Sequence, residues 1–310
     1  MKQKKLAESG VAKTTLKTRK QQIKVYFEFC VKFDLVAFPC SAAQASLYVT
    51  FLADKMKPVS VRNYLSAVWF FQKLRGFPDF SSNFILKKTL DGVERSSSSK
   101  PVVTYPLSSV DMLKIYSCLN MNIFVDRLFW CSIVVAFRAI LRCGHITDSV
   151  HSMKVKDVTV CNQYIRLHIV SSKTDQFGRH PYDIYLTRFD GSPLCPALLL
   201  LDLLKVRGLK MNSNLFSFNF KGRRVTQSYV YVNSRLKNLC VTCGILPKVS
   251  THSLRHGGAT LLKNLGMCTA DIMKRANWRS KAVYGYLHNT RTDLLKLDKL
   301  ASKYLSNLPM

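Results

Sequence analysis

The stretch His252-Ser253-Leu254-Arg255-His256 is expected to open a helix, because the Ser-Thr pair before it can supply the N-cap. His252, Arg255 and His256 stand at positions i, i+3 and i+4, so two imidazoles and a guanidinium share one helix face. Three groups that can all be cationic repel each other there, and a bound phosphate would offset that cost. Alone, the pattern is as typical of a solvated helix start as of a phosphate site. A metalloprotease helix would need Glu at the second position, where this chain has Ser253.

Further signals lie on both sides of this helix. Arg142 follows an apolar helical stretch, where an unpaired charge is costly to bury, although a surface Arg at a helix end is as common. Lys173 lies in a turn-rich segment between two stretches of alternating polarity. Trp278 is followed by Tyr284 and Tyr286, and such aromatic residues taken alone are more often packing residues. No one of these signals decides a function by itself.

The charge of the chain indicates a polyanionic partner. The 310 residues include 47 Lys and Arg against 18 Asp and Glu, a net charge of +29. Residues 1–100 hold 18 basic and 7 acidic side chains, so the excess is not a detachable tail. Hydrophobic residues make up 47% of the chain, enough for real cores, which leaves nucleic acid or an acidic membrane surface as the expected partner. No Glu follows Glu94, and this shortage of carboxylates argues against a metal-dependent nuclease.

Membrane, secretion and metal binding are all disfavoured by the sequence. The N-terminus is polar and no apolar segment follows it, so no signal peptide is expected. The longest apolar run, Leu128 to Phe137, is too short to span a bilayer. The ten cysteines are expected to be reduced and structural. A zinc site at Cys240-x-x-Cys243 would need a second ligand pair that the sequence does not offer.

Hydrophobic periodicity predicts a mainly α fold with a small antiparallel β-sheet, of the α+β class. The Ser run before Pro101 predicts a linker, which gives an N-terminal helical bundle at residues 1–95, a linker at 96–105 and a second domain at 106–310. The expected helices cover residues 13–35, 42–55, 61–74, 83–93, 108–117, 123–141 and 291–305, with helical patterns dominant from residue 196 onward, and the expected strands cover 155–160, 164–169 and 182–186.

Taken together and in order, these signals resemble the tyrosine recombinase (phage integrase) family, over nearly the whole chain. The matching positions are Arg142, Lys173, His252, Arg255, His256, Trp278 and Tyr286. The strings Leu141-Arg142-Cys143 and Ser172-Lys173-Thr174-Asp175-Gln176-Phe177-Gly178 look most like eukaryotic mobile-element recombinases of the Crypton and DIRS types. The N-terminal bundle is similar to the core-binding domain of the family, and residues 106–310 are similar to its catalytic domain.

The resemblance implies a site that grips one phosphodiester. Arg142 and Arg255 would bind its non-bridging oxygens, a task that suits bidentate guanidinium groups. His252 and Trp278 would add hydrogen bonds to the same phosphate. The family commonly has an acidic residue three positions after the first Arg, where this chain has His145.

The resemblance also assigns the covalent chemistry. Tyr286 would attack phosphorus, and its spacing from Trp278 favours it over Tyr284 as the nucleophile. Lys173 would protonate the leaving oxygen, and His256 would assist proton transfer with Tyr286. No metal, ATP or other cofactor is then expected.

The function implied is that of a site-specific recombinase or integrase of a mobile element, acting through a 3′-phosphotyrosine intermediate. Double-stranded DNA and a dimer to tetramer of the same chain are the expected partners, with no membrane, and a eukaryotic origin would place the protein in the nucleus. The alternative is a domesticated DNA-binding protein of the same fold that has lost catalysis. An RNA-binding module is disfavoured, because the common aromatic-basic motifs are missing.

Overall fold

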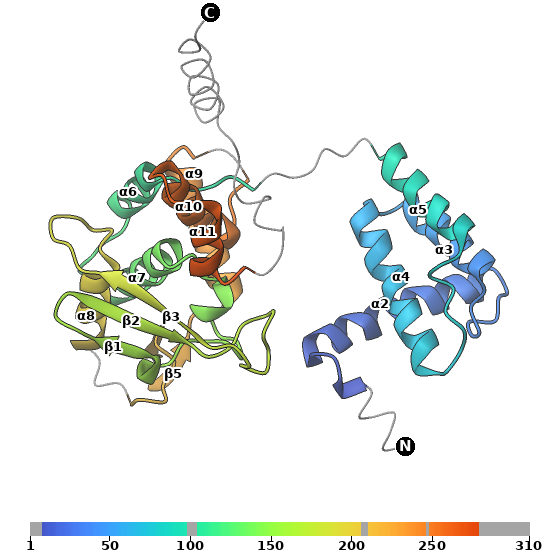
Figure 1. The fold of residues 1–310 in the computed structure, drawn as a ribbon, viewed down its shortest axis with the longest axis horizontal. Coiled ribbons are helices and arrows are strands. Elements are labelled where there is room, and N and C mark those ends of the chain that lie inside the picture. Colours follow the sequence, from blue (N-terminus) through green and yellow to red (C-terminus); the bar gives the residue numbers. More distant parts are fainter. Residues whose placement is uncertain (1–7, 98–103, 206–209, 246–247, 279–310) are drawn as a thin grey trace, which may run out of the picture. The chain divides into compact units, whose positions relative to one another are not determined.

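The computed structural model describes residues 8–97, 104–205, 210–245 and 248–278. The chain divides into two compact units, Met1–Val102 and Val103–Met310, and each unit is described by itself (Figure 1). The predicted linker spans residues 96–105, of which 98–103 lie outside the described residues. The core-binding and catalytic roles expected of the two domains stay predictions.

The first unit is a helical bundle around one apolar core. Its helices form where apolar residues recur every three or four positions, so that each helix buries one face. The Ser41 side chain accepts a hydrogen bond from the Gln44 N–H and caps α3, as the sequence predicts. The four helices predicted for this part of the chain are confirmed as α2 (Lys13–Lys32), α3 (Ala42–Ala53), α4 (Pro58–Leu74) and α5 (Phe84–Ser96).

The second unit packs helices around a three-stranded antiparallel sheet with the order β1-β2-β3. Buried and exposed side chains alternate along β2 and β3, so one face of the sheet joins the core. Helix α7 is buried over most of its length and contacts both α8 and α10 (Figure 1). The mainly α fold class with a small antiparallel sheet is thus confirmed. The elements are α6 (Ser109–Ser117), α7 (Phe124–Arg138), β1 (Val158–Val160), β2 (Tyr164–Ile169), β3 (Tyr182–Thr187), α8 (Pro196–Lys205), β4 (Ser217–Phe220), β5 (Arg223–Thr226), α9 (Tyr229–Thr242), α10 (Thr251–Asn264) and α11 (Thr269–Ala276).

Helices dominate the described residues after 196, as predicted, but the hairpin of β4 and β5 was not predicted. Most side chains of its two strands are exposed, so the strands lack the alternation that marks a half-buried strand in a sequence. The turn does have a local signature, since Lys221 and Gly222 both take a positive φ, as a tight two-residue hairpin turn requires. Only the glycine among these residues could have indicated the hairpin.

The ten cysteines are free thiols in the structure. Cys240 is buried in the core of the second unit, whereas the Cys243 Sγ lies 3.3 Å from the Cys118 Sγ. Within the described ranges, no group of three or more His, Cys, Asp or Glu side chains could hold a metal ion.

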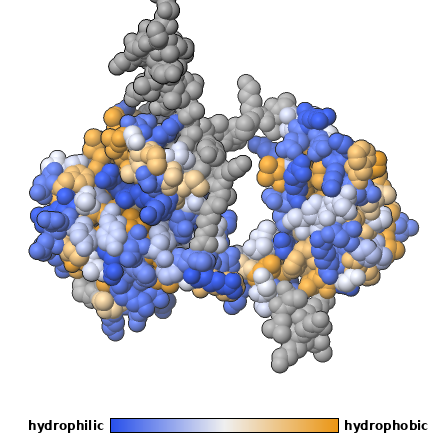
Figure 2. All heavy atoms as spheres, viewed as in Figure 1, coloured by the Kyte–Doolittle hydropathy of each residue, from blue (hydrophilic) through white to orange (hydrophobic). Residues whose placement is uncertain are grey.

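The visible face of each unit carries both polar and apolar residues. Figure 2 shows hydrophilic residues over much of the visible face, interrupted by smaller apolar patches. Of the helices that the structure describes, none has both the length and the apolar character needed to cross a bilayer.

Candidate functional site

The end of helix α7 sets the direction of the chain that carries Arg142. Ile140 takes the left-handed conformation with φ 52°, which is costly for a β-branched residue. The turn is closed by the Leu141 N–H, which donates to the carbonyl of Ala136 across 2.9 Å. Arg142 then begins the short 3₁₀ turn Cys143–His145, with its side chain half-buried. The helix therefore stops early, and Arg142 projects from a turn rather than from the helix surface.

Two adjacent glycines let helix α10 lie directly against the end of α7, at Gly258, and against the segment that precedes α6, at Gly257. A Cβ atom at Gly258 would overlap the carbonyl oxygen of Phe137, and one at Gly257 would overlap the carbonyl oxygen of Leu107. Backbone atoms of the two helices can meet this closely only where no side chain stands between them. The approach brings the first two turns of α10, with their predicted site residues, to the turn that follows α7.

Arg255 links three segments from within the core, with only 2% of its surface exposed. Its guanidinium donates to the carbonyl of Ile140 through Nη1, and to the carbonyl of Ala276 through Nη2 across 3.0 Å. Its Cζ also lies 4.8 Å from the ring centre of Trp278, within cation–π range. Trp278 is 8% exposed and packs in a small cluster with Ile140 and Ala276. The position of Arg255 is therefore fixed by the ends of α7 and α11.

Three of the predicted cationic residues lie within electrostatic reach of His252. This residue is exposed on the first turn of α10, where its N–H donates to the Ser250 side chain. Desolvation lowers the pKa of His252, and the positive charges of Arg255, Lys173 and Arg142 lower it further. The fold thus gathers cations from three distant parts of the sequence around one accessible imidazole.

Lys173 reaches this cluster from the turn between β2 and β3. Ser172 and Asp175 pair across the turn, each N–H donating to the other carbonyl across 3.0 Å. Lys173 and Thr174 form the exposed residues between them. The paired backbone holds the lysine in solvent, within electrostatic reach of His252, and the turn itself is what the turn-rich sequence predicts.

His145 occupies the position where the resembling family commonly has a carboxylate. It is buried, and its Nδ1 lies 3.2 Å from the carbonyl oxygen of His151, so Nδ1 carries the proton and donates it. Burial is the main reason that the pKa of His145 falls to about 4, and the charges of His151, Arg142 and Arg255 add to the effect. His145 is therefore a neutral neighbour of Arg142 at pH 7.

The burial of neutral His145 predicts a loss of stability in acid. Because its folded-state pKa is about 4 and its ordinary value is 6.5, the unfolded chain binds a proton more readily in this window. The free energy of unfolding should therefore fall as the pH drops from 6.5 towards 4, by on the order of 3 kcal/mol. Urea denaturation at a series of pH values measures this change in the free energy of unfolding. A His145→Gln variant should lose less stability over the same window than the exposed-site control His180→Gln, and equal losses would contradict the assignment.

Tyr182 is a neighbour of the site that sequence reasoning did not single out. It is half-buried at the start of β3, and burial raises its pKa while the charges of Arg255 and Arg142 act in the opposite direction. Its phenol therefore lies within electrostatic reach of both arginines. In the sequence it is simply one inward position of an alternating strand, so no local signal marks it.

Of the two remaining predicted residues, His256 belongs to the described residues and Tyr286 does not. His256 is 9% exposed, in the second turn of α10 next to Arg255. Tyr286, the expected nucleophile, lies outside the described residues, as do Tyr284 and the expected helix at 291–305.

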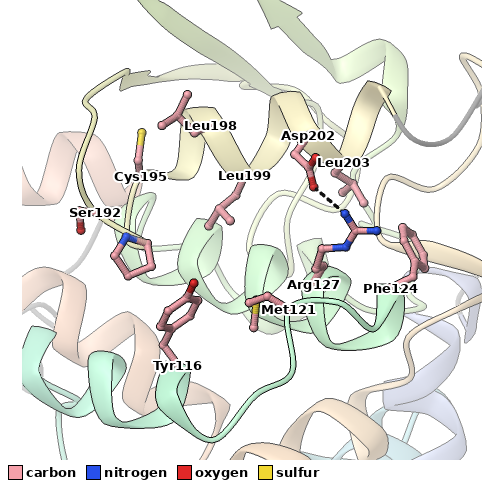
Figure 3. A pocket seen from close by; sticks show the side chains of 11 residues that line it. Tyr116, Met121, Phe124, Arg127, Ser192, Cys195, Leu198, Leu199, Asp202 and Leu203 are labelled. Carbon is pink, nitrogen blue, oxygen red and sulfur yellow. Dashed lines mark ion pairs between the residues drawn. The ribbon is translucent and has the colours of Figure 1, made fainter.

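A separate apolar cavity of about 280 Å³ lies near the start of α7 (Figure 3). Arg142 lies at the other end of this helix, after its last residue Arg138. Arg127 and Asp202 form an ion pair at the wall of the cavity, 3.5 Å apart. None of the predicted site residues lines it, so it is distinct from the cationic cluster. Its lining residues are Tyr116, Met121, Phe124, Arg127, Ser192, Pro193, Cys195, Leu198, Leu199, Asp202 and Leu203.

Comparison with known proteins supports the fold through structure and not through sequence. No protein-family model and no curated protein sequence matches the chain. Among solved structures, the XerH site-specific recombinase bound to its palindromic difH substrate, in a post-cleavage complex, matches with a TM-score of 0.66 and 19% identity, over 93% of this chain and 79% of that one.

Two further structures give similar matches. The Tn1549 transposon integrase in complex with circular intermediate DNA has a TM-score of 0.62 and 15% identity, over 93% of this chain and 94% of that one. A lambda integrase dimer bound to a COC′ core site has a TM-score of 0.62 and 17% identity, over 93% of this chain and 75% of that one. The structural neighbours are thus tyrosine recombinases and integrases, and the chain has their fold.

Proposed function

We propose that the chain is a site-specific DNA recombinase that cleaves and rejoins strands through a covalent 3′-phosphotyrosine intermediate. The observation that carries the proposal is that Arg142, Lys173 and Arg255 all lie within electrostatic reach of His252, which is exposed on the first turn of α10. Cations fixed around one point suit a phosphodiester, because charge builds on its non-bridging oxygens during phosphoryl transfer. A fold shared with recombinases that were solved with DNA bound supports the same function.

In this proposal the phosphate is held without a metal. Arg142 and Arg255 bind its two non-bridging oxygens, and His252 donates a further hydrogen bond. Trp278 is proposed to donate from its indole N–H, and the contact of its ring with the Arg255 guanidinium gives it a second role in holding that arginine. Because these groups are positioned by the ends of α7, α10 and α11, they need little rearrangement during the reaction.

The covalent step then proceeds by in-line displacement. The Tyr286 oxygen forms a bond to phosphorus as the bond to the 5′ oxygen of the next nucleotide breaks. Lys173 gives a proton to that leaving oxygen, and His256 receives the proton of the tyrosine hydroxyl. The phosphotyrosine keeps the energy of the broken bond, so strand rejoining needs neither ATP nor a metal.

Double-stranded DNA is the proposed partner, bound by both domains of a homo-oligomer of two to four chains. The N-terminal unit is proposed to act as the core-binding domain and the second unit as the catalytic domain. The net charge of +29, spread over both, suits a clamp whose affinity falls steeply with salt. The dimeric state of the matching lambda integrase supports assembly on DNA, and no membrane partner is proposed.

The biological setting rests on two short strings. Leu141-Arg142-Cys143 and the segment 172–178 resemble mobile-element recombinases of the Crypton and DIRS types. We therefore propose a role in the transposition or integration of such an element, in the nucleus of a eukaryotic host.

The nucleophile decides between this enzyme and an inactive DNA-binding protein. A library of nicked duplexes of random sequence serves as substrate, because a short fragment diffuses away after cleavage and leaves the covalent adduct trapped. Wild-type protein should form a DNA adduct that mass spectrometry maps to Tyr286, and Tyr286→Phe should form none.

The matched control is Tyr284→Phe, which should form adducts as the wild type does. Adducts that persist in Tyr286→Phe and vanish in Tyr284→Phe would move the nucleophile to the other tyrosine. Wild-type protein that binds the duplexes and forms no adduct would favour the domesticated DNA-binding protein.

A further inference from the structure

The turn that carries Lys173 also carries an aromatic side chain with no place in the chemistry just described. Phe177 is 81% exposed, the most exposed aromatic residue in the part of the chain that the structure describes. The Arg179 guanidinium lies 5.3 Å from its ring centre. Burial of such a ring against a partner is favourable in water, so this exposed ring is available for binding.

The turn is built to keep this shape. Besides the pairing of Ser172 with Asp175, the Asp175 carboxylate accepts the N–H of Arg179 across 3.0 Å and that of His180 across 2.8 Å. Gly178 has φ 62°, and a Cβ there would lie 2.8 Å from the carbonyl oxygen of Val170. The glycine therefore lets the chain fold back closely, immediately after Phe177, and the ring is held outward by the backbone.

The charges around the ring fit a nucleic acid. Lys173, Arg179 and His180 lie in the same turn as Phe177, all exposed. The single acidic residue of this segment, Asp175, is engaged by the two backbone N–H groups. An aromatic ring can stack on the bases of DNA, and exposed basic groups in the same turn can bind its phosphates.

We propose that Phe177 inserts its ring against the bases of duplex DNA beside the phosphodiester that the cationic cluster holds, and that Arg179 binds a neighbouring backbone phosphate. This inference rests on the proposed function, because it assumes that DNA is the substrate. Apolar side chains of DNA-binding proteins partly unstack base steps in this way. Phe177 would then make the local contact with the bases, and its position next to Lys173 would align the leaving oxygen with the acid.

The test measures equilibrium affinity for a short random-sequence duplex over a range of salt concentrations. Phe177→Ala should bind roughly five- to a hundredfold more weakly, the effect of losing one base–aromatic stack. Its salt dependence should equal that of the wild type, because no phosphate contact is lost. Arg179→Ala should instead reduce the slope of log affinity against log salt by about 1. Phe177→Trp should restore the affinity.

The chain offers a matched control in Phe220, which is 56% exposed at the β4–β5 hairpin with the Lys221 ammonium 5.7 Å from its ring centre. Phe220→Ala should bind DNA as the wild type does. With 5-iodouracil in the duplex, the photo-crosslink should map to Phe177 and not to Phe220.

Two kinds of result would contradict the inference about Phe177, and they have different consequences for the proposed function. If the wild type binds the duplex and Phe177→Ala binds equally well, or if both Phe→Ala variants lose the same affinity, the inference about Phe177 is wrong and the proposed function stands. If the wild type does not bind duplex DNA at all, the proposed function fails and this inference fails with it.

Discussion

Replacing Arg142 with lysine is expected to slow DNA strand cleavage at least about a thousandfold, while the fold and the affinity for DNA change little. Lysine keeps the positive charge but lacks the planar fork that binds two phosphate oxygens at once. No described residue makes a side-chain hydrogen bond or ion pair with the Arg142 guanidinium. The substitution therefore removes the proposed interaction with the phosphate and breaks no hydrogen bond or ion pair among the described residues.

Arg142 gives a clearer test than Arg255 for this reason. The Arg255 guanidinium is buried against the carbonyls of Ile140 and Ala276, so any change there also loosens the ends of α7 and α11. A slow rate in an Arg255 variant could therefore come either from the lost structural hydrogen bonds or from a lost catalytic contact.

The measurement is the single-turnover rate of adduct formation on the nicked duplexes, together with equilibrium binding to the same DNA. Arg224→Lys, an exposed arginine on β5, is the control and should change neither quantity. If the Arg142→Lys variant forms adducts at the wild-type rate, the proposed role of Arg142 in binding the phosphate is wrong.

Part of the local geometry of the candidate site could be predicted, because its signals are local. The positions of His252 and Arg255 on one helix face follow from their spacing, and the turn around Lys173 follows from its residue types. These features depend on a few neighbouring residues, so an unaligned sequence reveals them. The pattern of helices in the first unit is predictable for the same reason.

The burial of Arg255 could not be predicted in this way. The residue bonds to Ile140, 115 positions earlier, and to Ala276 at the end of another helix. The sequence predicts that the helix of α7 continues to Leu141, whereas it ends at Arg138. No glycine or asparagine marks the stop, because Ile140 takes the left-handed conformation itself.

Tertiary contacts compensate for that unfavourable conformation. The Ile140 carbonyl accepts from Arg255, and its side chain packs in the cluster that contains Trp278. A helix end held by residues so distant in sequence leaves no local trace. The same holds for Tyr182, whose approach to the arginines depends on the whole sheet.

Replacing Gly258 with alanine is expected to lower the free energy of unfolding of the second unit by about 3 kcal/mol. The added Cβ would overlap the carbonyl oxygen of Phe137, a backbone atom that cannot rotate away as a side chain could. Helix α10 would have to move off α7. The move would draw Arg255 away from the carbonyl of Ile140, so adduct formation should fall together with stability.

The control is Gly92→Ala in α5, where an added Cβ would meet nothing within 4 Å. Alanine is the better helix former, so this variant should stabilise the first unit by up to about 1 kcal/mol. Hydrogen exchange followed by mass spectrometry reads each unit from its own peptides. If Gly258→Ala leaves exchange in α7 and α10 unchanged, the two helices are not in backbone contact. Arg255 could then not reach Ile140, and the arrangement of cations around His252 would need another explanation.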